Sequence, residues 1–213
     1  MKKIYWGALG ILFLLLTAYV GRQSIAAYIG SWTMREDHPT KVDAVMILNG
    51  AFPRSVLAAA DLYHRGLTKK VIMTQEREWD GMDELRARKV SYPYLAALQK
   101  KSLLDLGVPD KNIVELTDVC DRTELEGIAL KKYLADHSDV KHIAFATRRS
   151  HTVRGRKILR NILGYDVQIS MLAYEKDPVR IETWTRDPWH LYEVSMEVLK
   201  LAWYYTVGIK HRS

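Results

Sequence analysis

The segment with the clearest chemical character is the basic stretch at residues 147–154, which reads TRRSHTVR. Residues 142–147 (HIAFAT) predict a strand, and Ser150 is a typical N-cap for the helix that follows. Arg148 and Arg149 precede that helix, whose free N–H groups and dipole favour an anion. Phosphate is the anion we expect, and a capped helix with solvated arginines is the alternative.

Two residue types near this stretch suggest proton transfer. His151 lies in the first turn of the expected helix, where it could act as a general acid or base or donate a hydrogen bond to a phosphate. Glu115 is expected to end a strand and to serve as a base, a metal ligand or a partner that orients Arg54. Because no tight ligand spacing such as His-x-x-x-His occurs, the sequence predicts no metal site.

The pattern of the chain predicts the elements that position these residues. Short apolar runs alternate with helical periodicity, which indicates an α/β fold: a three-layer, Rossmann-like parallel sheet with helices on both faces. The expected strands are 42–48, 70–75, 112–116, 142–147 and 167–171. The expected helices are 55–65, 92–106, 121–134 and 150–163.

Ligands of open α/β sheets bind beyond the carboxyl ends of the strands. That rule selects the residues following each expected strand as ligand-binding candidates. They are Asn49, Gly50 and Arg54, then Gln75 and Glu76, then Glu115, Thr117 and Thr123, and last Thr147, Arg148, Arg149, Ser150, His151 and Arg154.

Composition narrows the function classes. The formal net charge of +7 favours anionic partners, such as phosphorylated small molecules or lipid head groups. Basic residues are spread along the chain without a nucleic-acid-binding motif, so we expect no nucleic-acid partner. The single cysteine, Cys120, excludes an intrachain disulfide. No GxGxxG fingerprint, P-loop or GxSxG elbow occurs, which argues against a standard dinucleotide enzyme, NTPase or serine hydrolase and leaves the cofactor unknown.

The N-terminal segment predicts a membrane anchor. Residues 4–20 contain no charged side chain and would extend about 25 Å as a helix, which is near the lower limit for a span. Lys2 and Lys3 before it, against Arg22 after it, favour a cytoplasmic N-terminus. We therefore expect residues 1–32 to form a single-pass anchor in the cytoplasmic membrane, with residues 33–213 as an extracytoplasmic domain. A cleaved signal peptide is the alternative.

The tail at residues 189–209 lacks proline and is rich in Trp, Tyr and Leu. It predicts a helix, which would either pack on the sheet or lie on the membrane surface beside the anchor.

The ordered motifs of the chain resemble those of the YdcF-like family of α/β proteins. The matching pieces are DAVMILNG at 43–50, Arg54, Leu62-Tyr63 with Gly66, Gly107-Val108-Pro109, Ile113, Glu115, Thr123 with Glu126, and Thr147 with Ser150-His151 and Arg154. The resemblance implies a Rossmann-like domain, often membrane-anchored, that is linked to cell-envelope metabolism. It adds Glu126 to the ligand-binding candidates and suggests S-adenosylmethionine as a ligand.

Three functions remain open at this stage. The first is an envelope enzyme, a phosphate-ester hydrolase or transferase, that acts on a phosphorylated or pyrophosphorylated ligand such as a lipid-linked phosphate. In it Arg54, Arg149 and Arg154 hold the anion while His151 and Glu115 are catalytic. The second is a non-catalytic module that binds a nucleotide-like molecule or S-adenosylmethionine. The third is a structural envelope factor that recruits membrane proteins through its tail.

Overall fold

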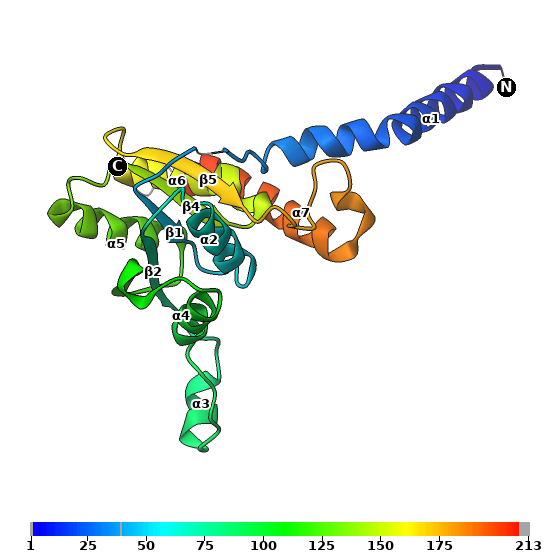
Figure 1. Cartoon of the computed structure of the whole chain (residues 1–213). Coiled ribbons are helices and arrows are strands. Elements are labelled where there is room, and N and C mark those ends of the chain that lie inside the picture. Colours follow the sequence, from blue (N-terminus) through cyan, green and yellow to red (C-terminus); the bar gives the residue numbers. More distant parts are fainter. Residues whose placement is uncertain (1, 39, 209–213) are drawn as a thin grey trace. The chain divides into compact units, whose positions relative to one another are not determined.

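The computed structural model describes residues 2–38 and 40–208, and its centre is a five-stranded sheet (Figure 1). Its order is β3-β2-β1-β4-β5, and every neighbouring pair is parallel. The predicted α/β fold with a parallel, Rossmann-like sheet is therefore confirmed. The strands are β1 (Ala44–Ile47), β2 (Val71–Glu76), β3 (Ile113–Cys120), β4 (His142–Thr147) and β5 (Gln168–Ala173).

Helices connect the strands in the order that the sequence predicts. The third strand is the clearest difference, because β3 continues to Cys120 where the apolar pattern predicts an end at Leu116. The helices of the sheet region are α2 (Arg54–His64), α3 (Met82–Ala87), α4 (Leu95–Asp105), α5 (Thr123–Asp136) and α6 (Thr152–Leu163), with short 3₁₀ turns η1 (Asp110–Asn112) and η2 (Arg149–His151).

Alternating strand residues build a core on each face of the sheet. Val45, Ile47 and Met73 pack with buried side chains of α2 and α4 on one face. Met46 and Phe145 pack with side chains of α5 and α6 on the other. Because both faces are covered, every residue of β1 is buried, as is typical of central parallel strands (Figure 1).

The chain divides into two compact units. The sheet and its helices form the α/β unit, Arg35–Asp177. The second unit consists of the chain up to Met34 and from Pro178 onward. It contains α1 (Lys2–Ser31), η3 (Trp184–Arg186), α7 (Pro188–Trp203) and a π-helical turn, η4 (Tyr204–Gly208).

Trp184 holds this second unit together. Its indole Nε1–H donates a 2.9 Å hydrogen bond to the carbonyl of Ala26 in α1. The same ring lies against Gly30, where an added Cβ would come within 2.9 Å of Nε1. Val194 of α7 is buried in the same apolar cluster, so the C-terminal helix and the second half of α1 share one small core.

Within residues 2–38 and 40–208, the structure contains no helix that is both long enough and apolar enough to cross a membrane. The transmembrane helix predicted over residues 4–20 therefore has no support from the fold and stays a prediction.

Phe145 is the largest side chain that is fully buried in the sheet core. We expect Phe145→Ala to lower the free energy of unfolding by about 3–5 kcal/mol, because it removes apolar contacts and leaves a cavity. Urea unfolding would measure the change. Tyr165→Ala, at a side chain that is 90% exposed, is the control and should leave stability almost unchanged. Equal effects of the two substitutions would contradict the burial described above.

Candidate functional site

The candidate site lies at the carboxyl edge of the sheet, where the strand order reverses. From β1 the chain moves outward through β2 to β3, and then returns to the other side of β1 to form β4 and β5. The ends of β1 and β4 are level, with Ile47 opposite Ala146. The connections after these two strands leave in opposite directions, which is the arrangement that opens a binding crevice in α/β proteins.

Asn49 organises the connection after β1. Its backbone N–H donates to Oε1 of Glu126 at 2.7 Å, and its side-chain Nδ2 donates to Oγ1 of Thr74 at 2.9 Å. Gly50 follows with φ +73°, a left-handed conformation that favours glycine at this turn. These contacts join the ends of β1 and β2 to the first turn of α5.

Among the carboxyl groups of the site, Glu126 has the pKa that departs most from its ordinary value. Its side chain is 2% exposed, and burial raises its pKa from an ordinary value of 4.5 to about 8. The N–H of Asn49 opposes that rise by stabilising the carboxylate, whereas the negative charge of Glu76 adds to it. Near pH 7 Glu126 is therefore mostly a neutral acid that can give up a proton.

Glu76 ends β2 and bridges two partners. Its Oε1 accepts the N–H of Gly50 at 3.1 Å, and its Oε2 accepts from Nε2 of Gln99 in α4 at 3.2 Å. Burial raises the pKa of Glu76, and the hydrogen bond from Gly50 and the charge of Arg148 lower it. Arg148 is thus a cation close to Glu76.

His151 and Thr123 form a buried pair across two helix starts. Nε2 of His151 lies 3.2 Å from Oγ1 of Thr123, and the two residues are 6% and 9% exposed. Gly155, one turn into α6, leaves room for the ring, because a Cβ there would lie 3.1 Å from Nε2 of His151. Thr123 and Glu126 share the first turn of α5, so this turn joins two hydrogen-bonded pairs, His151 with Thr123 and Glu126 with Asn49.

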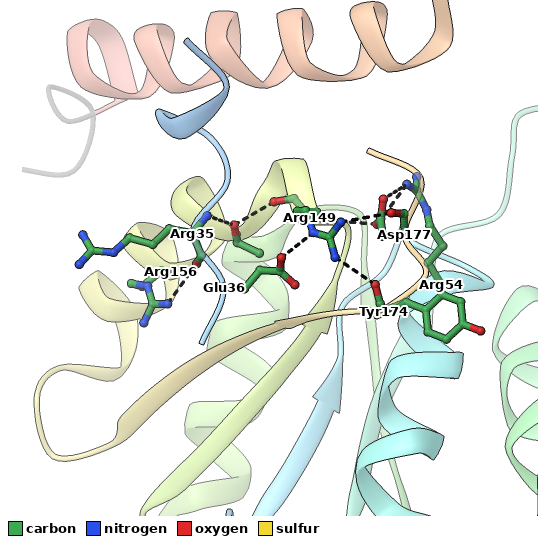
Figure 2. A network of polar contacts seen from close by, with 8 residues as sticks. Arg35, Glu36, Arg54, Arg149, Arg156, Tyr174 and Asp177 are labelled. Atoms are coloured by element: carbon green, nitrogen blue, oxygen red, sulfur yellow. Dashed lines mark hydrogen bonds and ion pairs between the residues drawn. The ribbon is translucent and has the colours of Figure 1, made fainter. Parts of the chain in front are cut away.

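Arg149 holds the loop before His151 in place (Figure 2). Its guanidinium pairs with Glu36 and donates to the carbonyls of Asp177 and Tyr174 at 3.1 and 3.4 Å. Its backbone N–H also donates to a carboxylate oxygen of Asp177 at 3.3 Å. The side chain is 7% exposed, so the structure gives Arg149 a structural role within the protein.

Arg54 pairs with Asp177, which also contacts Arg149. Its Nη1 lies 3.1 and 3.2 Å from the two carboxylate oxygens of Asp177, whose side chain is fully buried (Figure 2). A buried carboxylate needs such a partner, because an unpaired charge inside a protein is strongly unfavourable. Neither Arg54 nor Arg149 is therefore assigned to a ligand.

Glu115 lies apart from the other candidates. Since β3 runs to Cys120, Glu115 is five residues before its carboxyl end, about 16 Å along the strand. Its carboxylate pairs with Lys100 of α4 at 2.6 Å, and Lys100 also pairs with Asp110 at 2.8 Å. These two partners raise the pKa of the Lys100 ammonium group. Glu115 thus belongs to an ion-pair cluster on α4 and β3.

The remaining predicted residues of the β4 connection do lie at the carboxyl edge. Thr147 is buried at the last position of β4, and Ser150 is fully buried in η2. Arg154 is half-buried on the turn of α6 that follows Ser150. Among the described residues, no group of three or more His, Cys, Asp or Glu side chains is arranged to hold a metal ion.

Three residues that sequence reasoning did not select contribute to the site or its support. Gln99 interrupts the buried stripe of α4, and a polar residue on an apolar helix face is a signal that could have found it. Glu36 and Asp177 lie in loops without any motif, so only the three-dimensional contacts reveal them.

Comparison with models of protein families finds no match for this chain, and a search of curated proteins also finds none. The resemblance to the YdcF-like family stays a prediction, and the site must be interpreted from its own geometry.

The raised pKa of Glu126 predicts a specific pH dependence of stability. Between pH 4.5 and about 8 the folded protein holds a proton that the unfolded chain releases. The free energy of unfolding should therefore fall as pH rises through this window, by up to about 1.4 kcal/mol per pH unit. Glu126→Gln, which has no proton to lose and can still accept from Asn49, should not show this fall.

Urea unfolding of both proteins from pH 5 to 8 would measure the difference. Asp139→Asn, at an exposed carboxylate, is the control and should follow the wild-type profile. Parallel profiles for the wild type and Glu126→Gln would show that Glu126 is ionised at neutral pH.

Proposed function

We propose that the α/β unit binds a phosphorylated small molecule or a lipid-linked phosphate at the carboxyl edge of its sheet and hydrolyses or transfers the phosphoryl group. The observation that carries this proposal is the two hydrogen-bonded pairs, His151 with Thr123 and Glu126 with Asn49, which the first turn of α5 joins at the carboxyl edge of the sheet. Buried groups able to exchange protons at neutral pH are uncommon outside functional sites.

Helix starts favour an anionic ligand at this edge. The helices α2, α5 and α6 all begin just beyond the carboxyl ends of strands, so the positive ends of their dipoles gather there (Figure 1). Arg148 adds a cation beside Glu76. We assign anion binding to Arg148, which lies near Glu76 at this edge, since Arg54 and Arg149 already compensate Asp177 and Glu36.

In a phosphoryl transfer His151 would be the general base and Glu126 the general acid. His151 would accept the proton of the attacking water or alcohol as its oxygen bonds to phosphorus. Glu126, a neutral acid near pH 7, would donate its proton to the leaving oxygen as the old P–O bond breaks. Positioning and electrostatic stabilisation supply most of the catalysis in such reactions.

A nucleotide-like ligand is the second candidate, and the position of Glu76 favours it. In Rossmann-type sheets an acidic residue about 20 residues beyond the first turn accepts hydrogen bonds from a ribose. Glu76 ends β2, directly beside the Gly50 turn of β1. The same edge would then bind a nucleotide or S-adenosylmethionine without turnover.

We also propose that α1 attaches the protein to the cytoplasmic membrane, with the α/β unit on the extracytoplasmic side. The first 20 residues of α1 carry Lys2 and Lys3 and no acidic side chain. Several apolar side chains of this stretch are more than half exposed: Trp6, Ile11, Phe13, Leu16, Tyr19 and Val20. Exposed apolar surface of this kind is typical of a region that meets lipid.

A ligand screen tests the two binding proposals on the full-length protein purified in detergent. Thermal shift would be recorded with sugar phosphates, nucleotides, polyprenyl phosphate analogues and S-adenosylmethionine, with and without divalent cations. A ligand at 100 times its Kd should stabilise the protein by about 2.7 kcal/mol. We expect a phosphorylated ligand to do so, and Arg148→Ala to weaken its binding about tenfold.

Two variants separate turnover from binding. His151→Asn should abolish turnover of a bound phosphate ester with only a modest change in Kd. Glu76→Gln should weaken nucleotide-like ligands selectively. Lys141→Ala, at an exposed lysine, is the control. If no compound shifts a well-folded sample, or if His151→Asn turns substrate over at the wild-type rate, the enzymatic proposal is wrong.

Cysteine labelling tests the membrane proposal. Cys120 is 1% exposed, and burial raises the pKa of its thiol to about 11, so it should react poorly with maleimides. Asp80 is fully exposed, and Asp80→Cys would provide one reactive thiol on the α/β unit. We expect a membrane-impermeant maleimide to label it in intact spheroplasts. Labelling only after lysis would place the unit in the cytoplasm.

A further inference from the structure

Helix α7 exposes a line of large apolar side chains. Trp189, Tyr192, Leu199 and Trp203 are 79%, 61%, 62% and 57% exposed. At 3.6 residues per turn, they lie within an arc of about 80° on one side of the helix. We call these four residues the outer stripe of α7. Single exposed aromatic side chains are ordinary, but an aligned set on one helix face usually contacts lipid or another protein.

The opposite side of α7 is occupied by its own unit. Val194 lies opposite the stripe and is fully buried in the cluster with Trp184 and Ala26. Glu197, on the flank of the helix, is 2% exposed, and Tyr204 of η4 is 3% exposed. The helix is therefore already fixed by one face. The outer stripe is not needed to hold it, so its composition calls for a different explanation.

The carboxylates of α7 are buried or half-buried, whereas its lysine is partly exposed. Glu197 is buried and Glu193 is half-buried, while the carboxylate of Asp187 accepts the N–H groups of Trp189 and His190 at the helix start. On the flank of the stripe Lys200 pairs with Glu197 at 3.3 Å and remains 45% exposed, and Arg186 is exposed just before the helix. The outer stripe is thus flanked by a partly exposed lysine, and no carboxylate of α7 is exposed beside it.

We propose that the outer stripe of α7 lies in the interfacial layer of a lipid bilayer that carries anionic head groups. Trp and Tyr have an apolar ring and a polar atom, which suits the boundary between head groups and acyl chains. Exposed cations beside an apolar face add attraction to anionic lipid. This inference rests on the proposed membrane attachment through α1.

The surface of α1 in the same unit supports a lipid partner over a protein partner. Ile25, Tyr28 and Trp32 are 50%, 66% and 46% exposed, and the rings of Tyr28 and Trp32 are in edge contact with their centroids 5.4 Å apart. Exposed apolar side chains therefore occur along α1 from Trp6 to the end that Trp184 ties to its unit. Such extended apolar surface fits a continuous lipid phase better than a single docking site.

Site-specific quenching tests this proposal on the full-length protein. Cysteines introduced at Tyr192 or at Leu199 would carry an environment-sensitive fluorophore, and Asp80→Cys is the matched reference on the α/β unit. Protein would be reconstituted into vesicles with about 30% phosphatidylglycerol in phosphatidylcholine. We expect nitroxide-bearing acyl chains to quench the fluorophore at 192 and 199 several-fold more strongly than at 80.

Flotation of the same samples measures membrane attachment through α1 independently of the quenching. Protein that floats with vesicles but shows equal quenching at 192, 199 and 80 would overturn the outer-stripe proposal and leave the anchor intact. Protein that does not float would overturn both. A blue shift at 192 that disappears on dilution, without lipid quenching, would indicate a second copy of the chain on the stripe and would also overturn the proposal.

Discussion

The buried guanidinium of Arg149 is the interaction on which the candidate site depends. Moving a cation into the protein interior costs several kcal/mol unless its hydrogen bonds are satisfied there. Arg149 meets that requirement by contacting Glu36, Tyr174 and Asp177, which come from distant parts of the sequence (Figure 2). The loop between β4 and α6 is thereby fixed, and with it the position of His151. Pre-organisation of this kind is what a site needs in order to act on a bound ligand.

A second constraint arises from the carboxyl groups at the edge. Glu76 and Glu126 each accept a backbone N–H of the β1 turn, which places two acids close together in a partly dry environment. Burial disfavours the charged form of Glu126 and raises its pKa, and the negative charge of Glu76 adds to that rise, so Glu126 retains its proton near neutral pH. The same backbone turn after β1 thus holds Glu126, the group that we propose as the proton donor.

Much of the fold could be predicted from the sequence, because its signals are local. Apolar runs such as 142–147 and stop signals such as Gly164 mark the elements, and most boundaries agree within two or three residues. The extension of β3 to Cys120 could not be predicted, because residues 117–120 alternate in burial on an edge strand and lack an apolar run. Sequence position identified Asn49, Glu76, Thr123 and His151 as neighbours, since carboxyl ends of parallel strands meet at one edge.

The roles of the arginines could not be predicted in the same way. Whether Arg54 and Arg149 meet a ligand or a carboxylate depends on Glu36 and Asp177, which are far away in sequence and carry no motif. Local spacing also cannot show that α7 shares a core with α1, since that pairing depends on Trp184.

The positions at which the chain enters and leaves the α/β unit have a mechanical consequence. On entry, the N–H of Arg35 donates to Oγ1 of Thr152 at 2.7 Å, and at the exit Asp177 accepts the N–H of Arg149 at 3.3 Å. Both attachments are made to one four-residue stretch. Tension applied along the chain would therefore load this stretch before the bonds of Asp37 to Met171 in β5. The first bonds to be strained would be those that flank His151.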